Sequence, residues 1–161
     1  VAERARGFGM EIHYHNRSRL SPDLEVGAIY YADAEEMLRE VDILSMNCPA
    51  TPETQGFLNA TRIKLMKDGA IVLNSARGSV IVDEALISAL QSGKLSAAGL
   101  DVFDREPNID QRYLTLENAF LMPHIGSATV ETRNAMGFRA LDNLDAIFSG
   151  REPADRIAYP R

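Results

Sequence analysis

Short apolar segments rich in β-branched residues alternate along this chain with segments of helical periodicity, and this alternation restricts the fold more than any other feature. The apolar segments are too short for helices and end in polar clusters, which is typical of buried strands. We expect strands at residues 10–16, 28–31, 41–47, 70–73, 97–101 and 119–122. Strands and helices that alternate at this spacing predict an α/β fold, in which helices cover both faces of a parallel sheet.

The helical segments between these strands are marked by charge and capping patterns as well as by their period. The clearest runs from Asp83 to Gln91, with acidic residues in its first turn and Gly93 just past its end. Others are expected at residues 1–6, 33–40, 59–66 and 129–148. The last of these carries an apolar stripe made of Met136, Ala140, Leu141, Leu144, Ile147 and Phe148. Such a stripe either packs within the chain or forms an interface, and the sequence leaves both readings open.

Composition and charge exclude several classes of function. The chain has 161 residues and a net charge of −6 with no basic run, which argues against nucleic-acid binding. No apolar run reaches membrane-spanning length, so no membrane partner is expected. The single cysteine, Cys48, excludes an internal disulfide and favours a reducing, cytoplasmic setting. His13 and His15 alternate on an expected strand without a third ligand, so we expect no metal site.

A polar cluster, Asn74-Ser75-Ala76-Arg77-Gly78, follows the expected strand at 70–73. It places an arginine at the carboxyl end of a strand, which is where open α/β sheets bind their ligands. The planar guanidinium of Arg77 suits a bidentate grip on a carboxylate. An arginine after a strand is more often a loop-bracing residue, so this position alone does not define a site.

Two further motifs follow in order: residues 99–107 read Gly-Leu-Asp-Val-Phe-Asp-Arg-Glu-Pro, and residues 121–127 read Leu-Met-Pro-His-Ile-Gly-Ser. Together with residues 74–78 they closely resemble the second half of the D-isomer-specific 2-hydroxyacid dehydrogenases. The nearest branch is similar to the glyoxylate and hydroxypyruvate reductases. The resemblance runs from about Gly9 to about Gly150, and it implies a Rossmann-like, doubly wound parallel sheet.

The resemblance also implies roles for three residues. Arg77 would bind the substrate's carboxylate and carbonyl oxygen, and His124 would deliver the proton when hydride reduces a 2-oxo acid. An imidazolium suits this task near neutral pH. Glu106 would stabilise the charged imidazole and fix its orientation. Asp101, at the end of a strand, would accept hydrogen bonds from the nicotinamide carboxamide, although an Asp there could also simply cap a loop.

Cofactor choice depends on the sequence Asn16-Arg17-Ser18 after the first expected strand. An NAD site usually has an acidic residue here for the ribose hydroxyls, and the first carboxylate after this strand is Asp23. An arginine and a hydroxyl match a 2′-phosphate instead. We therefore predict a preference for NADP(H), with NAD still possible. The resemblance adds further cofactor-binding positions: Cys48, Pro49, Thr54, Ser75, Ala76, Ile125 and Gly126. Cys48 is expected to pack there and not to react, since no base adjoins it.

The pair Gly7 and Gly9 does not form a dinucleotide fingerprint, because it precedes a strand and Ile12 stands where the third glycine belongs. Relative to the family, the sequence is expected to start inside the first helix and so to lack the first strand and the glycine-rich turn. Residues 1–150 would then be a partial NAD(P)-binding domain. Residues 151–161 would be a loose tail leading toward a substrate domain.

The leading hypothesis is an NADP(H)-dependent oxidoreductase that acts on a small 2-oxo acid such as glyoxylate or hydroxypyruvate. Two alternatives remain: a nucleotide-sensing protein like the corepressors that share this fold, and a catalytically silent fragment. Formate dehydrogenases are disfavoured because they pair the histidine with glutamine. The resemblance further implies a homodimer formed through the cofactor domain.

Overall fold

The computed structural model describes residues 1–157, which form two compact units. The first unit runs from Val1 to Pro123, and the second starts at His124. Residues 124–150, which we expected in the cofactor-binding domain, therefore lie in the second unit. Each unit is described by itself.

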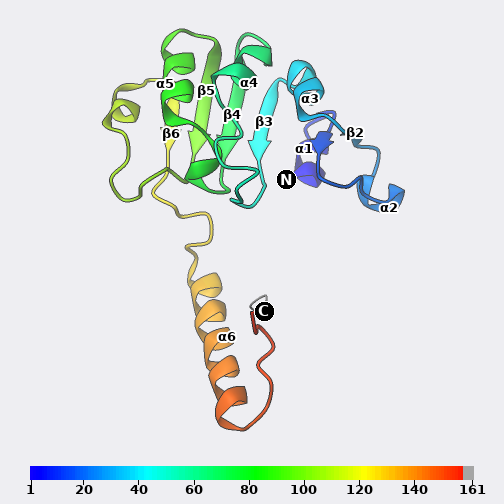
Figure 1. Cartoon of the computed structure of the whole chain (residues 1–161), viewed down its shortest axis with the longest axis vertical. Coiled ribbons are helices and arrows are strands. Elements are labelled where there is room, and N and C mark those ends of the chain that lie inside the picture. Colours follow the sequence, from blue (N-terminus) through cyan, green and yellow to red (C-terminus); the bar gives the residue numbers. More distant parts are fainter. Residues whose placement is uncertain (158–161) are drawn as a thin grey trace. The chain divides into compact units, whose positions relative to one another are not determined.

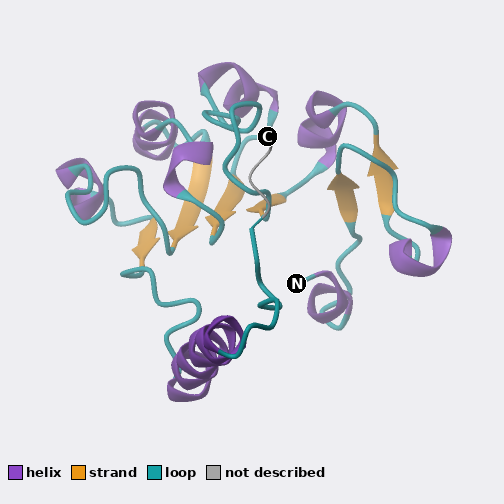
Figure 2. Cartoon of the chain, turned by 60° about the horizontal axis from the view of Figure 1, so that its bottom comes forward, coloured by secondary structure: helices purple, strands orange, loops and turns teal. Residues whose placement is uncertain are grey.

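Strands and helices alternate throughout the first unit, as the sequence predicts (Figures 1 and 2). Its order is α1 (Ala2–Arg6), β1 (His13–His15), α2 (Pro22–Glu25), β2 (Ile29–Tyr31), α3 (Ala34–Glu40), β3 (Ile43–Met46), α4 (Ala60–Leu65), β4 (Ala70–Asn74), η1 (Gly78–Val80), α5 (Asp83–Gln91), β5 (Leu95–Leu100), η2 (Gln111–Thr115) and β6 (Ala119–Leu121). The short elements α2, η1 and η2 were not predicted from the sequence. Asp33 and Asn59 cap α3 and α4 by accepting backbone N–H bonds.

All strand pairs in this unit are parallel, which confirms the predicted Rossmann-like α/β class. Strands β3, β4, β5 and β6 form one sheet in that order, and β1 pairs with β2 in a separate two-stranded sheet. Because parallel strands share one direction, the loops that follow β3, β4 and β5 leave from the same edge of the four-stranded sheet. As expected for a strand lacking one neighbour, β1 pairs on one side only within residues 1–157.

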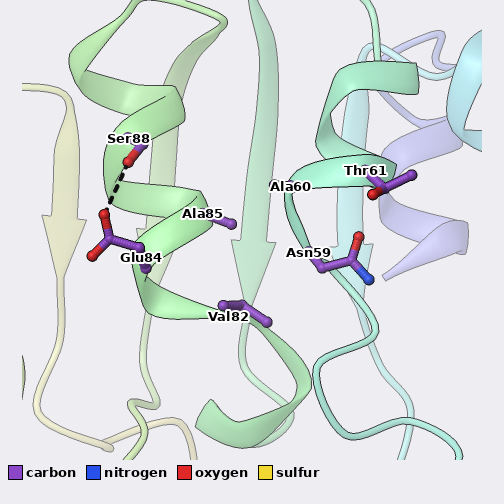
Figure 3. A pocket seen from close by; sticks show the side chains of 7 residues that line it. All are labelled: Asn59, Ala60, Thr61, Val82, Glu84, Ala85 and Ser88. Atoms are coloured by element: carbon purple, nitrogen blue, oxygen red, sulfur yellow. Dashed lines mark hydrogen bonds between the residues drawn. The ribbon is translucent and has the colours of Figure 1, made fainter.

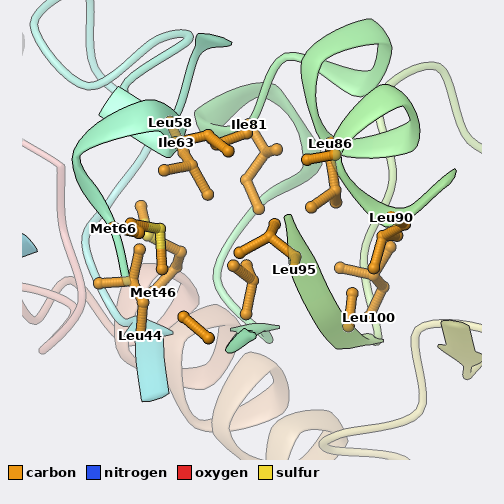
Figure 4. Close-up of a cluster of buried hydrophobic side chains, with 14 of the residues drawn as sticks. Leu44, Met46, Leu58, Ile63, Met66, Ile81, Leu86, Leu90, Leu95 and Leu100 are labelled. Atoms are coloured by element: carbon orange, nitrogen blue, oxygen red, sulfur yellow. The ribbon is translucent and has the colours of Figure 1, made fainter. Parts of the chain in front are cut away.

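The hydrophobic core lies between the four-stranded sheet and helices α4 and α5 (Figure 4). Leu58, Leu86, Leu95 and Val72 are fully buried there. Within the first unit, α4 and α5 cover one face of this sheet, and Ile43, Leu73 and Phe120 lie on its other face. The strands are added in a single direction, and right-handed crossovers then place α4 and α5 on the same face.

Tyr113 ties η2 to the start of α5, and its loss should be measurable. Its ring is 1% exposed, and its hydroxyl donates to Asp83 Oδ1 at 2.8 Å. Tyr113→Phe should lower the free energy of unfolding by about 1–2 kcal/mol, since Asp83 loses a partner in a partly buried site. Denaturant unfolding measures this, with Tyr31→Phe as the comparison: its hydroxyl contacts His13 at a less buried site, so its loss should cost less. Equal losses in both variants would contradict the role of the Tyr113–Asp83 bond.

The second unit is built on the long helix α6 (Val130–Phe148), capped by Thr129. The predicted apolar stripe is present, and within the second unit its residues Leu141 and Phe148 are 55% and 85% exposed. The expectation of a loose tail is wrong at Asp155, whose carboxylate accepts two hydrogen bonds from Arg139 and one from Asn143. This bidentate, charge-assisted pairing holds the tail on the helix. The last four residues of the predicted tail, 158–161, lie outside the described residues.

Candidate functional site at the carboxyl ends of the strands

Asn74, the last residue of β4, organises the loop that carries Arg77. Asn74 is 2% exposed, and its side-chain amide accepts a hydrogen bond from Ala76 N at 3.0 Å and donates one to the Arg77 carbonyl at 3.0 Å. Its own carbonyl accepts the Asp101 N–H at 2.9 Å, which joins the ends of β4 and β5. A buried amide therefore fixes the backbone of residues 75–78, here called the Arg77 loop.

Gly78 brings the Arg77 loop into direct contact with the loop that carries Glu106. A Cβ atom at Gly78 would lie 1.9 Å from the Phe103 carbonyl carbon and 2.2 Å from the Asp104 nitrogen. Real Cβ atoms do not approach backbone so closely, so only glycine fits here. The Arg77 loop and residues 102–107, here called the Glu106 loop, thus pack backbone against backbone.

The Arg77 side chain is exposed at this edge of the sheet, as are Ser75 and, in part, Ala76. One guanidinium nitrogen of Arg77 donates to the Ala76 carbonyl at 2.6 Å. Within residues 1–157 the other guanidinium N–H groups of Arg77 make no further hydrogen bond, and the exposed side chain leaves them accessible. The position fits the predicted role of binding a carboxylate.

The Glu106 loop is held by its own glutamate and contains a strained residue. Glu106 Oε1 accepts the Phe103 N–H at 2.8 Å, and Arg105 has a φ of 62°. A left-handed conformation of a residue other than glycine costs roughly 1 kcal/mol or more and is found preferentially at functional sites. Asp101, which leads into this loop, is 3% exposed, whereas Glu106 is exposed. The first unit therefore brings together the loops that carry Arg77 and Glu106, two of the three predicted catalytic residues.

His124 begins the second unit, together with Ile125 and Gly126. His124 has a φ of 54°, so it too is held in the left-handed region that non-glycine residues avoid. Its side chain is exposed, and Ile125 is 48% exposed. The Ile125 carbonyl accepts the Ala128 N–H at 2.9 Å, which closes the turn just before α6.

The predicted cofactor residues of β1 and of the loop after β3 also lie at strand ends. Asn16, Arg17 and Ser18 follow β1 directly and are exposed. A hydrogen bond from Thr51 lowers the pKa of Glu53, and the positive charge of Arg17 lowers it further. Residues 16–21, here called the β1–α2 loop, therefore lie within electrostatic reach of the loop that follows β3.

Thr54 and Cys48 have structural roles in the loop after β3. Thr54 Oγ1 donates to the Pro49 carbonyl at 2.6 Å and accepts the Thr51 N–H at 2.8 Å. Cys48 is half-buried and packs against the core, and this burial raises the pKa of its thiol. A thiol that resists ionisation is a poor nucleophile, which agrees with the packing role expected from the sequence.

A surface depression of about 390 Å³ lies elsewhere, where α4 and α5 begin, and Ser88 donates to Glu84 at its edge (Figure 3). None of the predicted site residues lines it, and it lacks the convergent charges of a substrate site. Among residues 1–157 no group of three histidine, cysteine, aspartate or glutamate side chains could hold a metal ion. No helix in this part of the chain is long and apolar enough to cross a membrane.

Comparison with known proteins identifies the family of this chain. Residues 1–126 match the sequence profile described as D-isomer specific 2-hydroxyacid dehydrogenase, NAD binding domain. The chain belongs to this family. It is 41% identical over 160 residues to a glycerate dehydrogenase of Hyphomicrobium methylovorum, covering 98% of this chain and 50% of that one. It is 46% identical over 154 residues to a glyoxylate reductase of Pyrococcus furiosus, covering 95% and 46%.

A solved structure gives the same result for the fold. The NADPH-dependent glyoxylate/hydroxypyruvate reductase of Sinorhizobium meliloti, in complex with NADP and malonate, has a TM-score of 0.91 and 38% identity. The match covers 98% of this chain and 48% of that one. The chain thus spans about half the length of the relatives it matches.

Sequence reasoning missed two residues that shape this site, Asn74 and Gly78. Both lie inside the quoted motif, but their roles depend on contacts that sequence spacing does not reveal. A signal for Asn74 was available, since a polar amide at the end of a buried strand needs hydrogen-bond partners.

Proposed function

We propose that this chain supplies the cofactor-binding part and the acid–base residues of an NADP(H)-dependent oxidoreductase for small 2-oxo acids such as glyoxylate and hydroxypyruvate. The observation that carries the proposal is the direct contact between the Arg77 loop and the Glu106 loop at one edge of a parallel sheet. Family membership supplies the hydride chemistry, and this contact joins the backbones of the loops that carry Arg77 and Glu106.

The residues present fit a nicotinamide dinucleotide. The carboxyl edge of a parallel sheet is where such cofactors bind, and the exposed Arg17 and Ser18 at the end of β1 suit a 2′-phosphate. When bound, the nicotinamide ring exchanges a hydride with the substrate carbon. Asp101, Cys48, Pro49, Thr54, Ser75, Ala76, Ile125 and Gly126 are proposed as further cofactor contacts.

The chain's own residues are proposed to bind the acid and move the proton. Arg77 binds the substrate carboxylate through two parallel N–H bonds and orients the carbonyl. His124 donates a proton to the developing alkoxide in reduction and takes it back in oxidation. Glu106 stabilises the charged imidazole. The malonate complex of the S. meliloti reductase supports a small carboxylate as the ligand class.

Cofactor preference is tested with Arg17→Ala. This variant should weaken NADPH binding by about tenfold or more, because a charge-assisted contact to the phosphate is lost, while NADH binding changes little. Titration calorimetry of the full chain measures both affinities. Equal losses for the two cofactors would contradict the assignment of Arg17 to the 2′-phosphate.

Turnover separates the proposed enzyme from the alternatives. NADPH oxidation is followed with glyoxylate and with hydroxypyruvate. Cofactor binding with turnover supports the enzyme, binding without turnover indicates a nucleotide-sensing protein, and absence of both indicates a silent fragment. Sedimentation velocity on the same samples tests the homodimer, which is part of this proposal.

A further inference from the structure

The β1–α2 loop, which carries Arg17 and Ser18, is fixed at both of its ends. Tyr30 donates its hydroxyl hydrogen to the Asn16 carbonyl at 3.3 Å, where the loop leaves β1. The backbone N–H of Leu20 donates to the Tyr14 hydroxyl oxygen at 3.0 Å, where the loop approaches α2. Hydrogen bonds with Tyr14 and Tyr30, which lie on the neighbouring strands β1 and β2, thus hold the two ends of the loop.

A buried carboxylate lies behind this loop. Glu25, the last residue of α2, is 7% exposed. Its Oε1 accepts the Tyr14 hydroxyl at 2.6 Å, and both carboxylate oxygens accept hydrogen bonds from Arg19 at 2.7 and 3.1 Å. Tyr14 therefore bridges Glu25 and the backbone of Leu20. Buried charges persist where they are paired and hydrogen-bonded in this way.

The ion pair between Arg19 and Glu25 gives the two arginines of the loop, Arg17 and Arg19, different roles. Arg19 is neutralised by Glu25, and its guanidinium also lies over the Tyr30 ring at 5.8 Å. Within residues 1–157 the side chains of Arg17 and Ser18 make no hydrogen bond or ion pair, and both are exposed. The acidic group near Arg17 is Glu53, whose pKa Arg17 helps to lower. The loop thus presents the cation of Arg17 and the hydroxyl of Ser18 to solvent, whereas its second cation, Arg19, is paired with Glu25.

We propose that Tyr14, Arg19 and Glu25, here called the Glu25 anchor, are positioning residues that hold the β1–α2 loop so that Arg17 and Ser18 meet the 2′-phosphate of NADP(H). The proposal rests on the NADP(H) preference proposed above. A preordered loop binds with less loss of conformational entropy, so the anchor raises affinity for the phosphate without touching it. Phosphate selectivity then depends on residues that the phosphate does not contact.

The test uses fragments of the cofactor that reach only the adenosine side. The full 161-residue chain is titrated with 2′,5′-ADP and with 5′-AMP, and NMR amide shifts give both affinities. Tyr14→Phe keeps the ring and removes the bridge, and Glu25→Gln keeps the volume and removes the charge. Each should reduce the affinity ratio of 2′,5′-ADP to 5′-AMP by about fivefold, the worth of one ordinary hydrogen bond. Tyr31→Phe, whose hydroxyl contacts His13 instead, is the matched control.

The ratio separates positioning from general damage, because a merely structural defect weakens both fragments together. A lower ratio in Tyr14→Phe and Glu25→Gln, with Tyr31→Phe unchanged, supports the anchor. A ratio that falls in Arg17→Ala but is unchanged or higher in both anchor variants overturns the anchor and leaves the NADP(H) preference standing. A wild-type chain that does not prefer 2′,5′-ADP overturns both proposals.

Discussion

Replacing Gly78 with alanine should lower the free energy of unfolding by about 3 kcal/mol, the upper end of the range for overpacked sites. The added methyl group would overlap the Phe103 carbonyl carbon and the Asp104 nitrogen at 1.9 and 2.2 Å. These atoms belong to backbone, so no side-chain rotation relieves the overlap and one of the two loops must move. Denaturant unfolding measures the loss, and the Phe103 and Asp104 amide resonances should shift most.

Gly137→Ala provides the matched control, since it adds the same methyl group to a glycine inside α6. Apart from its chain neighbours and the nearby backbone of the helix itself, no heavy atom lies within 4 Å of that methyl position, and the backbone is helical. Alanine should therefore stabilise the helix by roughly 0.5–1 kcal/mol. A Gly78→Ala protein as stable as wild type, with the Phe103 and Asp104 resonances unchanged, would show that the two loops are not in the contact described here.

The elements predicted with most accuracy are those whose signals are local. Helix α5 has the predicted bounds, Asp83–Gln91, because its apolar period and acidic first turn lie within one segment. Strand β4 was predicted one residue short, because Asn74 looks like a loop residue by composition although it continues the ladder beside Met46. Local strand propensity contains no information about a pairing partner that lies 28 residues away in the chain, as Met46 does from Asn74.

The site could be predicted as a set of residues but not as an arrangement. The contact of Gly78 with Phe103 joins segments 25 residues apart, and no spacing rule reveals it. The Glu25 anchor was hidden for a related reason. Tyr14 lies in the strand expected at 10–16, but Arg19 and Glu25 lie between that strand and the next one, and a buried ion pair leaves no pattern in sequence. Both features depend on tertiary packing, which also determines where polar groups can be buried.

His124→Gln should reduce the rate of glyoxylate reduction by about 10²–10⁴-fold, the usual contribution of a general acid. Glutamine has a similar size and can donate a hydrogen bond, but it cannot release a proton to the alkoxide. The loss should appear in kcat for both reduction and oxidation, since one group gives and takes the same proton. NADPH oxidation and NADP reduction, each followed optically, provide the two rates.

The binding of NADPH should be unchanged in His124→Gln within about twofold, because the substitution destabilises the transition state and leaves the ground state unaffected.

Arg77→Lys provides a second variant for comparison. Lysine keeps the charge but loses the bidentate geometry, so this substitution should mainly raise KM for the 2-oxo acid. The left-handed φ of His124 adds a structural check, because glutamine must adopt the same strained backbone. If His124→Gln and Arg77→Lys produced the same kinetic change, the separate roles assigned to proton transfer and carboxylate binding would be wrong. A kcat effect confined to His124→Gln would instead identify the residue at the start of the second unit as the proton donor.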